Sequence, residues 1–592
     1  MSRRVTRGGE GVKVANYFLD NDDVQLLFEH SDLRRLATLY EEGFRFCREF
    51  DFAPEDAEDA VDNYRRLLTC LGELAADVIA PTAAETDRVG NVLNEDGSVT
   101  YAPGIAEALK RLGQADLMGF TLPYHFGGLN CPQLLYTMSN EIVSRADASL
   151  MNLYGLQGIA ETINAYADET IKEAVLPEMA AGRKTGAMVL TEPDAGSDLQ
   201  AIKVRAFQDG AGTWFVQGVK RFITNGCGDV LLVLARSEPG MADARGLSLF
   251  LVERGPRVKV RRLEEKLGIH GSPTCELFFD DAPARLVGQR QRGLVTYVMS
   301  LMNGARIGIA AQSLGIGEAA YRVARDYAAK RKQFGLEIDR IPAVRELLVD
   351  MSVDLQAARA LTYYASFSVD LETGAVRAIE GRTGGGEEGR RLQQEARVLR
   401  HVNAMLTPMS KYVASEMSMR VANGAVAVLG GSGYMKDYSV ERHLRDSRIT
   451  TIYEGTSQLQ VVAAMGGVVG GTARMLVESL LERAWPEAVA PLVEQVREGL
   501  GLLDEAVGFA KEHQGAGYLG LYSRRIVDMG CTLIIAALLC GQAAANERKL
   551  ATARRWLAAK FPELRMNREM VCSGDEIVMT EFDALAGAAP AS

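Results

Sequence analysis

The sequence predicts an α+β protein that is mainly helical, because the spacing of its apolar residues changes twice along the 592 residues. From about Ala57 to Gly186, apolar residues recur at helical spacing. Between about Ala187 and Gly288, they alternate with polar residues or form short runs, as in strands. From Gly293 onward, the helical spacing returns. We therefore expect two helical regions with a strand domain between them.

The middle strands follow one another without intervening helices, which predicts an antiparallel sandwich or barrel. The segments that carry this pattern are Thr213–Gly218, Val230–Leu234, Leu247–Val252 and Cys275–Phe279. Long helices are then expected at Gly293–Phe334, Ala343–Glu372, Gln393–Leu429 and Ser457–Met465. The acidic, glycine-rich stretch Glu380–Gly389 predicts an exposed insertion between two helices, and Gly466–Gly471 predicts a hinge.

These elements predict five segments. They are an N-terminal extension (1–55), an N-terminal helical domain (56–186), a middle β domain (187–290), a C-terminal helical domain (291–470) and an additional C-terminal helical domain (471–592). The last segment has amphipathic helices and none of the residue patterns of a catalytic site, so we expect it to pack on the rest of the chain or on a partner. Pockets favour junctions between domains, so a large cofactor is expected where the helical and strand layers meet.

Composition restricts the class of protein. Apolar residues make up 47% of the chain and charged residues 24%, as in a soluble globular protein. A formal charge of −11 argues against a nucleic-acid partner. The eight cysteines form no CxxC pair, and the basic N-terminus lacks an apolar signal region, so a cytoplasmic protein without a structural metal is expected. The apolar run Cys531–Cys540 is too short to span a bilayer and predicts a buried helix, so no transmembrane segment is expected, although peripheral contact with a membrane is left open.

Glu454 is the candidate catalytic base, because it lies between bulky apolar residues and a predicted helix start. Thr456 or Ser457 can cap that helix. The apolar neighbours that can exclude water from the carboxylate are Ile452, Tyr453 and Leu459. A helix N-terminus favours the carboxylate by about 0.3–2 kcal/mol, whereas full burial can raise its pKa by roughly 3–5 units, so burial should dominate once substrate closes the site.

Six short motifs follow one another along the chain. They are Met188–Asp198, Phe222–Gly226, Lys266–Thr274, Arg331–Gly335, Leu429–Tyr434 and Ile452–Thr456. In this order they resemble the acyl-CoA dehydrogenase family, over about residues 60 to 470. The resemblance implies that family's fold, in which the C-terminal domain (291–470) is a four-helix bundle. The terminal extensions resemble long bacterial members such as 3-methylmercaptopropionyl-CoA dehydrogenase and, more distantly, the very-long-chain type.

The resemblance implies FAD as the cofactor. The residues that match flavin contacts are Met188, Leu190, Thr191, Gly196, Ser197, Phe222, Thr224, Gly430, Gly431, Thr456 and Gln458. Arg331, Gln333 and Phe334 match residues that reach the FAD of a neighbouring subunit, which implies a homodimer or a dimer of dimers. Phe222 stands where most members have Trp, and Ala427 stands where the medium-chain type has a Gln contact, so flavin tuning is expected to differ here.

The implied reaction is the conversion of an acyl-CoA thioester to a trans-2-enoyl-CoA, as in fatty acid β-oxidation. Glu454 would remove the α-proton while the β-hydrogen leaves as a hydride to flavin N5, and an electron-transfer flavoprotein would accept the electrons. The residues that match substrate contacts are Ser197, Asn303, Arg306, Tyr453 and Gly455. Some relatives place the base at the position of Ala305, where this chain has no carboxylate.

Three alternatives stay open at this point. An acyl-CoA oxidase shares the fold but typically has Gly-Asp where this chain has Gly455-Thr456. A DNA-associated flavoprotein of the same family would require a basic surface, which the charge of −11 disfavours. A noncatalytic flavin-binding scaffold would not need Glu454. The dinucleotide-like stretch Gly315–Ala320 follows no strand, so it predicts close helix packing.

Overall fold

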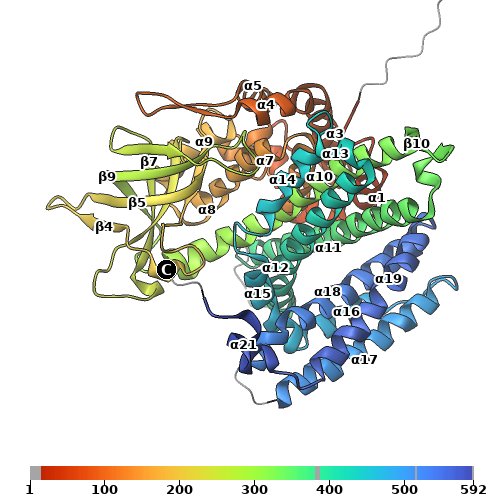
Figure 1. Cartoon of the computed structure of the whole chain (residues 1–592). Helices are drawn as coiled ribbons and strands as arrows, with labels where there is room; N and C mark the ends of the chain where they lie inside the picture. Colours follow the sequence, from red (N-terminus) through yellow and green to blue (C-terminus); the bar gives the residue numbers. More distant parts are fainter. Residues whose placement is uncertain (1–14, 381–386, 514–516, 590–592) are drawn as a thin grey trace, which may run out of the picture.

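The computed structural model describes residues 15–380, 387–513 and 517–589. A small strand domain lies at one end of the molecule, long helices run through the middle, and the C-terminal helices pack beneath them (Figure 1). The α+β fold with a β-rich middle domain is confirmed.

The N-terminal region is mainly helical. Its helices are α1 (Asp22–His30), α2 (Leu33–Tyr40), α3 (Ala57–Leu74), α4 (Ala83–Val89), α5 (Pro103–Gln114), α6 (Gln133–Ala146), α7 (Ala148–Gly155), α8 (Ile159–Tyr166) and α9 (Glu169–Ala180). A short hairpin of β1 (Val92–Leu93) and β2 (Val99–Thr100) joins α4 to α5. The apolar faces of these helices share one core with the long helices that follow, and α1 and α2 of the predicted N-terminal extension contribute to it.

The strand domain is a closed barrel with two added strands. Its strands are β3 (Gly186–Val189), β4 (Arg205–Gln208), β5 (Trp214–Thr224), β6 (Val230–Arg236), β7 (Leu247–Glu253), β8 (Val258–Leu263) and β9 (Thr274–Val287). The ring runs β6–β4–β5–β9–β7 and returns to β6, with β3 beside β6 and β8 beside β9. The expectation of a wholly antiparallel sheet is wrong, because β3 and β4 both pair with β6 in parallel. A long connection separates β3 from β6, which leaves room for the crossover that a parallel pair requires.

The second helical region contains the longest helices. They are α10 (Met299–Lys330), α11 (Pro342–Glu380), α12 (Glu387–Leu429), α13 (Gly431–Tyr434), α14 (Val440–Thr450) and α15 (Ser457–Val469), with a hairpin of β10 (Lys332–Gln333) and β11 (Leu336–Glu337). Of the predicted insertion, residues 381–386 lie outside the described residues, and 387–389 belong to α12. Gly315 of α10 packs against α6, where a Cβ atom would lie 2.5 Å from the carbonyl oxygen of Glu141, so the expected helix packing is confirmed.

The predicted hinge begins later than expected. Helix α15 continues through Gly466 and Gly467, and the chain bends by 69° between α15 and the next helix. A Cβ atom on Gly467 would lie 2.7 Å from that of Met405, so this glycine allows close packing on α12. The bend follows at Gly471, whose φ is +89°.

The C-terminal helices form a second core. They are α16 (Thr472–Leu481), α17 (Ala490–Glu512), α18 (Tyr518–Ala545), α19 (Arg548–Val571), α20 (Ile577–Thr580) and α21 (Phe582–Ala586). By length and apolar composition alone, Ala57–Val89, Gly293–Lys330 and Tyr518–Ala545 could each cross a membrane. The Cys531–Cys540 run lies within α18, a helix of 28 residues, so it belongs to a longer apolar element than the run itself indicates. The buried helix itself is confirmed, since 78% of the apolar window of α18 is buried.

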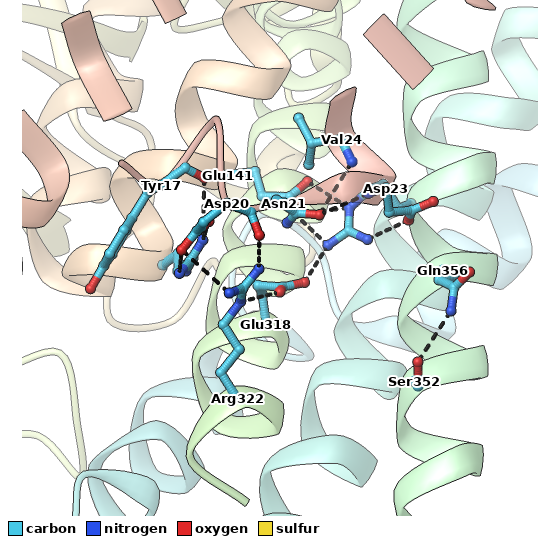
Figure 2. A network of polar contacts seen from close by, with 12 residues as sticks. Tyr17, Asp20, Asn21, Asp23, Val24, Glu141, Glu318, Arg322, Ser352 and Gln356 are labelled. Carbon is cyan, nitrogen blue, oxygen red and sulfur yellow. Dashed lines mark hydrogen bonds and ion pairs between the residues drawn. The ribbon is translucent and has the colours of Figure 1, made fainter. Parts of the chain in front are cut away.

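A cluster of charges joins the N-terminal region to the long helices (Figure 2). Arg359 of α11 is 1% exposed and forms ion pairs with Asp23 of α1 at 2.5 Å, Glu141 of α6 at 2.7 Å and Glu318 of α10 at 2.7 Å. Lys549 of α19 also contacts Asp23. Burial opposes ionisation of Glu318, but Arg359 and other arginines outweigh it and lower its pKa to about 2. The cluster thus fixes α6, α10 and α11, which line the site described next.

Candidate active site

Glu454 lies in a tight turn between α14 and α15. Its φ is +53° and that of Gly455 is +88°, so a residue with a side chain adopts the left-handed region. Lys411 Nζ donates to the Gly455 carbonyl oxygen at 2.6 Å, and Gln460 Nε2 donates to the same oxygen at 2.9 Å and to that of Glu454 at 3.1 Å. The Thr456 hydroxyl caps α15 by accepting from Leu459 N at 3.4 Å, as predicted. These contacts hold the strained turn in one conformation.

Glu454 is half-buried, and removal of its carboxyl group from water raises its pKa to about 7. The positive charges of Lys411 and Arg306 limit this rise. Among the described residues, no cation lies within ion-pair distance of the carboxylate. Burial therefore outweighs the effects that favour the charged carboxylate. This is the case even in the protein without substrate.

The residue before the base is held by a network of amides. The hydroxyl of Tyr453 contacts the side-chain oxygens of Asn152, at 3.1 Å, and Gln312. Gln312 Nε2 donates to Asn152 Oδ1 at 2.9 Å and to the Ala148 carbonyl oxygen at 2.9 Å. The network connects the turn to α7 and α10. Neither amide was among the predicted site residues, because each lies in a helix far from Tyr453 in sequence.

A cavity of about 720 Å³ opens beside Glu454. Small residues of α10, namely Gly304, Ala305 and Gly308, form part of its wall. Met188 and Thr224 of the barrel also line it, so the expected meeting of helical and strand layers is present. The cavity continues between α6, α8 and α11 as far as Tyr40 of α2. Ala305 faces this cavity, so the position where other members place the base is present here without a carboxylate.

The predicted flavin residues on the barrel lie around the ends of β3 and β5. Leu190 and Thr191 use their carbonyl oxygens to accept hydrogen bonds from Lys220 Nζ at 2.7 Å and from Arg221 N at 3.0 Å. The following loop, which carries Gly196 and Ser197, is anchored by Glu192. That carboxylate is buried and accepts from the backbone of residues 203 and 204 and from Lys220 Nζ at 2.9 Å. Burial lowers the pKa of Lys220 to about 8, against the effect of Glu192.

The geometry fits a planar aromatic cofactor at this edge of the barrel. Phe222 has a φ of +61°, and 51% of its surface is exposed although it is a large apolar residue. The guanidinium of Arg221 lies 4.6 Å from the centre of its ring. Thr224, two residues further on, lines the cavity of Glu454. An uncovered ring next to a reactive cavity is what a bound isoalloxazine would cover.

The other predicted flavin residues are spread over the molecule. Arg331, Gln333 and Phe334 belong to the exposed β10–β11 hairpin, at the end of the molecule opposite the barrel (Figure 1). Phe334 is 91% exposed. Gly430, with a φ of +62°, precedes α13, which begins at Gly431. Gln458 Nε2 donates to Ser523 Oγ of α18 at 3.2 Å, so this residue contacts the C-terminal helices.

Two predicted substrate residues occupy α10. Arg306 Nη1 donates to Asn303 Oδ1 at 3.0 Å. Arg306 is 9% exposed, and its Nε atom has no hydrogen-bond partner among the described residues. Burial lowers the pKa of Arg306, whereas Glu454 raises it. A buried guanidinium near the base is suited to balancing its negative charge.

Comparisons with known proteins agree with this arrangement. Residues 62–183 match the N-terminal domain of acyl-CoA dehydrogenases, residues 187–282 the middle domain, and residues 292–381 with 390–466 the C-terminal domain. A short-chain-specific acyl-CoA dehydrogenase of Clostridium acetobutylicum is 32% identical over 67% of this chain and 95% of its own length. The chain therefore belongs to the acyl-CoA dehydrogenase family, a family of flavoprotein oxidoreductases that act on CH–CH groups.

Two solved structures show how far the fold extends. A chain in the structure titled electron transferring flavoprotein of Acidaminococcus fermentans is 29% identical, with a TM-score of 0.59, and matches 69% of this chain and 98% of its own. An acyl-CoA dehydrogenase of Bacillus anthracis, complexed with FAD, is 22% identical, with a TM-score of 0.73, and matches 90% of this chain and 92% of its own. The second likeness shows that the shared fold reaches into the helices beyond residue 471.

Proposed function

We propose that this chain catalyses the FAD-dependent α,β-dehydrogenation of an acyl-CoA thioester to the trans-2-enoyl-CoA, with Glu454 as the base. The observation that carries the proposal is a carboxyl group removed from water, with a pKa raised to about 7, at the wall of a cavity of about 720 Å³. A base with a pKa near the working pH combines a useful fraction of carboxylate with the affinity to take a proton. A buried carboxylate is also more reactive than a solvated one.

The backbone of the same turn can polarise the substrate. Among the described residues, the N–H group of Glu454 donates no hydrogen bond. Lys411 and Gln460 bind the carbonyl oxygens of Gly455 and Glu454, the two that follow this N–H group, so the turn that presents it is held in place. A thioester oxygen placed against it would gain a hydrogen bond as negative charge develops. One turn would thus provide both the base and a donor for the enolate oxygen.

FAD, when bound, supplies the acceptor for the hydride of the β-carbon. Within one chain, the residues that would hold it are Met188, Leu190, Thr191, Phe222 and Thr224. The exposed hairpin with Arg331, Gln333 and Phe334 would complete the site of a second chain, which supports a homodimer or a dimer of dimers. We also propose an electron-transfer flavoprotein as the electron acceptor and the cytoplasm as the location.

The proposed division of labour follows the five predicted segments. Residues 56–470 would carry the chemistry, and residues 1–55 and 471–592 would support them. Tyr40 lines the cavity, so the N-terminal extension would also contribute to its wall.

The experiment compares Glu454→Gln with the wild type under anaerobic conditions. The amide keeps the shape of the side chain but cannot take a proton. We expect the variant to be yellow and to bind acyl-CoA, but neither to lose its flavin absorbance nor to form enoyl-CoA. The exposed Glu487 provides a matched control, and Glu487→Gln should behave as the wild type. Near-normal turnover by Glu454→Gln would exclude the proposed base, and oxygen consumption that matches turnover would indicate an acyl-CoA oxidase.

A further inference from the structure

The cavity of Glu454 contains two further carboxyl groups, those of Glu161 and Glu372, which the proposed reaction does not use. Glu372 pairs with Arg400 at 3.2 Å. Glu161 of α8 lines the same cavity. Its side chain is half-buried and faces this interior space. Burial raises the pKa of Glu161, while the Thr121 hydroxyl and the charge of Arg377 oppose the rise. Among the described residues, no cation lies within ion-pair distance of the carboxylate. A partly buried carboxyl group without a cationic partner destabilises the fold unless a ligand or water forms hydrogen bonds with it.

The carboxyl groups of Glu161 and Glu454 lie in different parts of the cavity. Burial first, and then the charges of Asp370 and Glu161 among others, raises the pKa of Tyr40. The charge of Glu161 also adds to the effect of burial on the pKa of Asp370. The pKa of Glu454 responds instead to Lys411 and Arg306. Glu161 therefore lies beside α2 and α11, at the end of the cavity remote from the base.

The remote wall carries further polar groups. Asn140 of α6 lines the cavity, is fully buried, and has no hydrogen-bond partner for either side-chain polar atom among the described residues. The other polar residues on this wall include Thr121, Gln133 and Thr162. The cavity wall also includes Asn152, next to the base, but its amide oxygen already accepts from Tyr453 at 3.1 Å and from Gln312 at 2.9 Å. The amide beside the base is thus satisfied within the protein, whereas that of Asn140 is not.

We propose that the acyl group of the substrate carries an uncharged hydrogen-bonding group, such as a hydroxyl, at its end remote from the thioester, where Glu161 and Asn140 bind it. An unsubstituted alkyl end would leave the buried amide of Asn140 without a partner and would take water away from the Glu161 carboxyl group. The carboxylates of Glu161 and Glu372 on the cavity wall are matched by two guanidinium groups, that of Arg377, which also lines the cavity, and that of Arg400, which pairs with Glu372 at 3.2 Å. Neither a cationic nor an anionic end is therefore favoured. This inference rests on the proposed function, because it assumes that an acyl chain occupies the cavity.

The test compares acyl-CoA thioesters of equal chain length that end in methyl, hydroxyl, amino or carboxyl groups, over short to long chains. We expect the wild type to have at least roughly tenfold higher kcat/KM for the best hydroxyl-ended thioester than for its methyl-ended match, the size of effect that one hydrogen bond to a charged group gives. Glu161→Leu and Asn140→Leu should reduce or reverse this ratio, and Glu161→Gln should retain most of it. Glu487→Leu serves as the surface control.

Calorimetric binding of the same thioesters separates the two proposals. If no thioester is turned over, the proposed function fails, but tighter binding of the hydroxyl-ended ligand would still support the polar subsite. If the methyl-ended thioester is preferred or equal in the wild type, or if an amino or carboxyl end is preferred, the inference is wrong even for an active dehydrogenase. The kcat/KM ratios of the wild type for these thioesters test the inference even if a leucine variant does not fold.

Discussion

Lys411 Nζ donates a hydrogen bond of 2.6 Å to the carbonyl oxygen of Gly455, the residue after the candidate base Glu454. Lys411 is fully buried in α12, and burial lowers its pKa to about 8, although Glu454 raises it. The ammonium therefore serves two purposes. It holds the strained turn through the carbonyl oxygen, and its charge favours the carboxylate without engaging the carboxylate oxygens. Those oxygens stay free to accept a proton.

The first prediction is that Lys411→Met lowers activity and moves its pH dependence. Without the ammonium, the pKa of Glu454 should rise above about 7, so the acidic limb of the kcat/KM profile should shift to higher pH. Loss of a charged hydrogen bond costs about 1.5–3 kcal/mol, or roughly a ten- to hundredfold decrease in kcat/KM at pH 7. Lys411→Arg keeps the charge and should shift the limb less. An unchanged profile in Lys411→Met would show that the lysine does not influence the base.

The second prediction concerns stability and does not depend on activity. The folded state holds the Glu454 pKa at about 7, against an ordinary value of 4.5. Below pH 4.5 the Glu454 carboxyl group is protonated in both the folded and the unfolded state, so it does not change the free energy of unfolding. Between pH 4.5 and 7 the carboxyl group loses its proton more readily in the unfolded state, so the free energy of unfolding falls as pH rises. Above pH 7 the full decrease amounts to about 3 kcal/mol.

Glu454→Gln removes this titration. Its stability relative to the wild type should therefore increase between pH 4 and pH 8, as measured by denaturant unfolding at each pH. Glu487→Gln is the control and should show no such trend. A constant difference between Glu454→Gln and the wild type over this range would mean that the folded-state pKa of Glu454 is not raised.

Much of this site follows from local sequence, and the rest does not. The base, its cap Thr456 and the barrel segment with Phe222 lie within short motifs, so pattern alone places them. Lys411 contacts a turn more than 40 residues away, and only one local signal marks it: a single charge in the apolar stretch of α12. Glu161 gave no signal, because a glutamate on an amphipathic helix is ordinarily a solvated residue. Long-range packing alone shows that it faces the cavity.

The third prediction addresses the buried charge cluster. Arg359→Met would leave Asp23, Glu141 and Glu318 buried without their shared cation. Breaking a buried ion pair in this way costs about 3–5 kcal/mol, so we expect a large loss of stability in denaturant unfolding. Lys549→Met removes the contacts of α19 with Asp23 and with Gln356 of α11 but leaves Arg359 in place, and should chiefly increase proteolysis of the C-terminal helices. Equal stability of Arg359→Met and the wild type would contradict this account of the cluster.

The fourth prediction concerns assembly. If the hairpin completes the FAD site of a partner, Arg331→Ala should weaken FAD binding although it leaves Glu454 intact. Mixing Arg331→Ala with Glu454→Gln chains, after dissociation and reassociation, should restore part of the activity, because one of the two sites then combines Glu454 with Arg331. Each variant reassociated alone is the control. A fully active monomer at working concentration would show that each chain completes its own site.

The last prediction is that deletion after Gly471 disrupts folding or assembly and removes no catalytic group. Helix α18 packs on α15, where Gly530 lies against Val468, and Gln458 contacts Ser523. Deletion would expose the apolar face of α15 and its neighbours on α12, which belong to the second core. We expect aggregation or loss of the native oligomer, measured by light scattering and size-exclusion chromatography, because exposed apolar surface of this extent drives association. Deletion after Gly574 removes only the short final helices and is the matched control. A deleted chain that stays folded but no longer binds flavin or thioester would instead place the C-terminal helices within the active site.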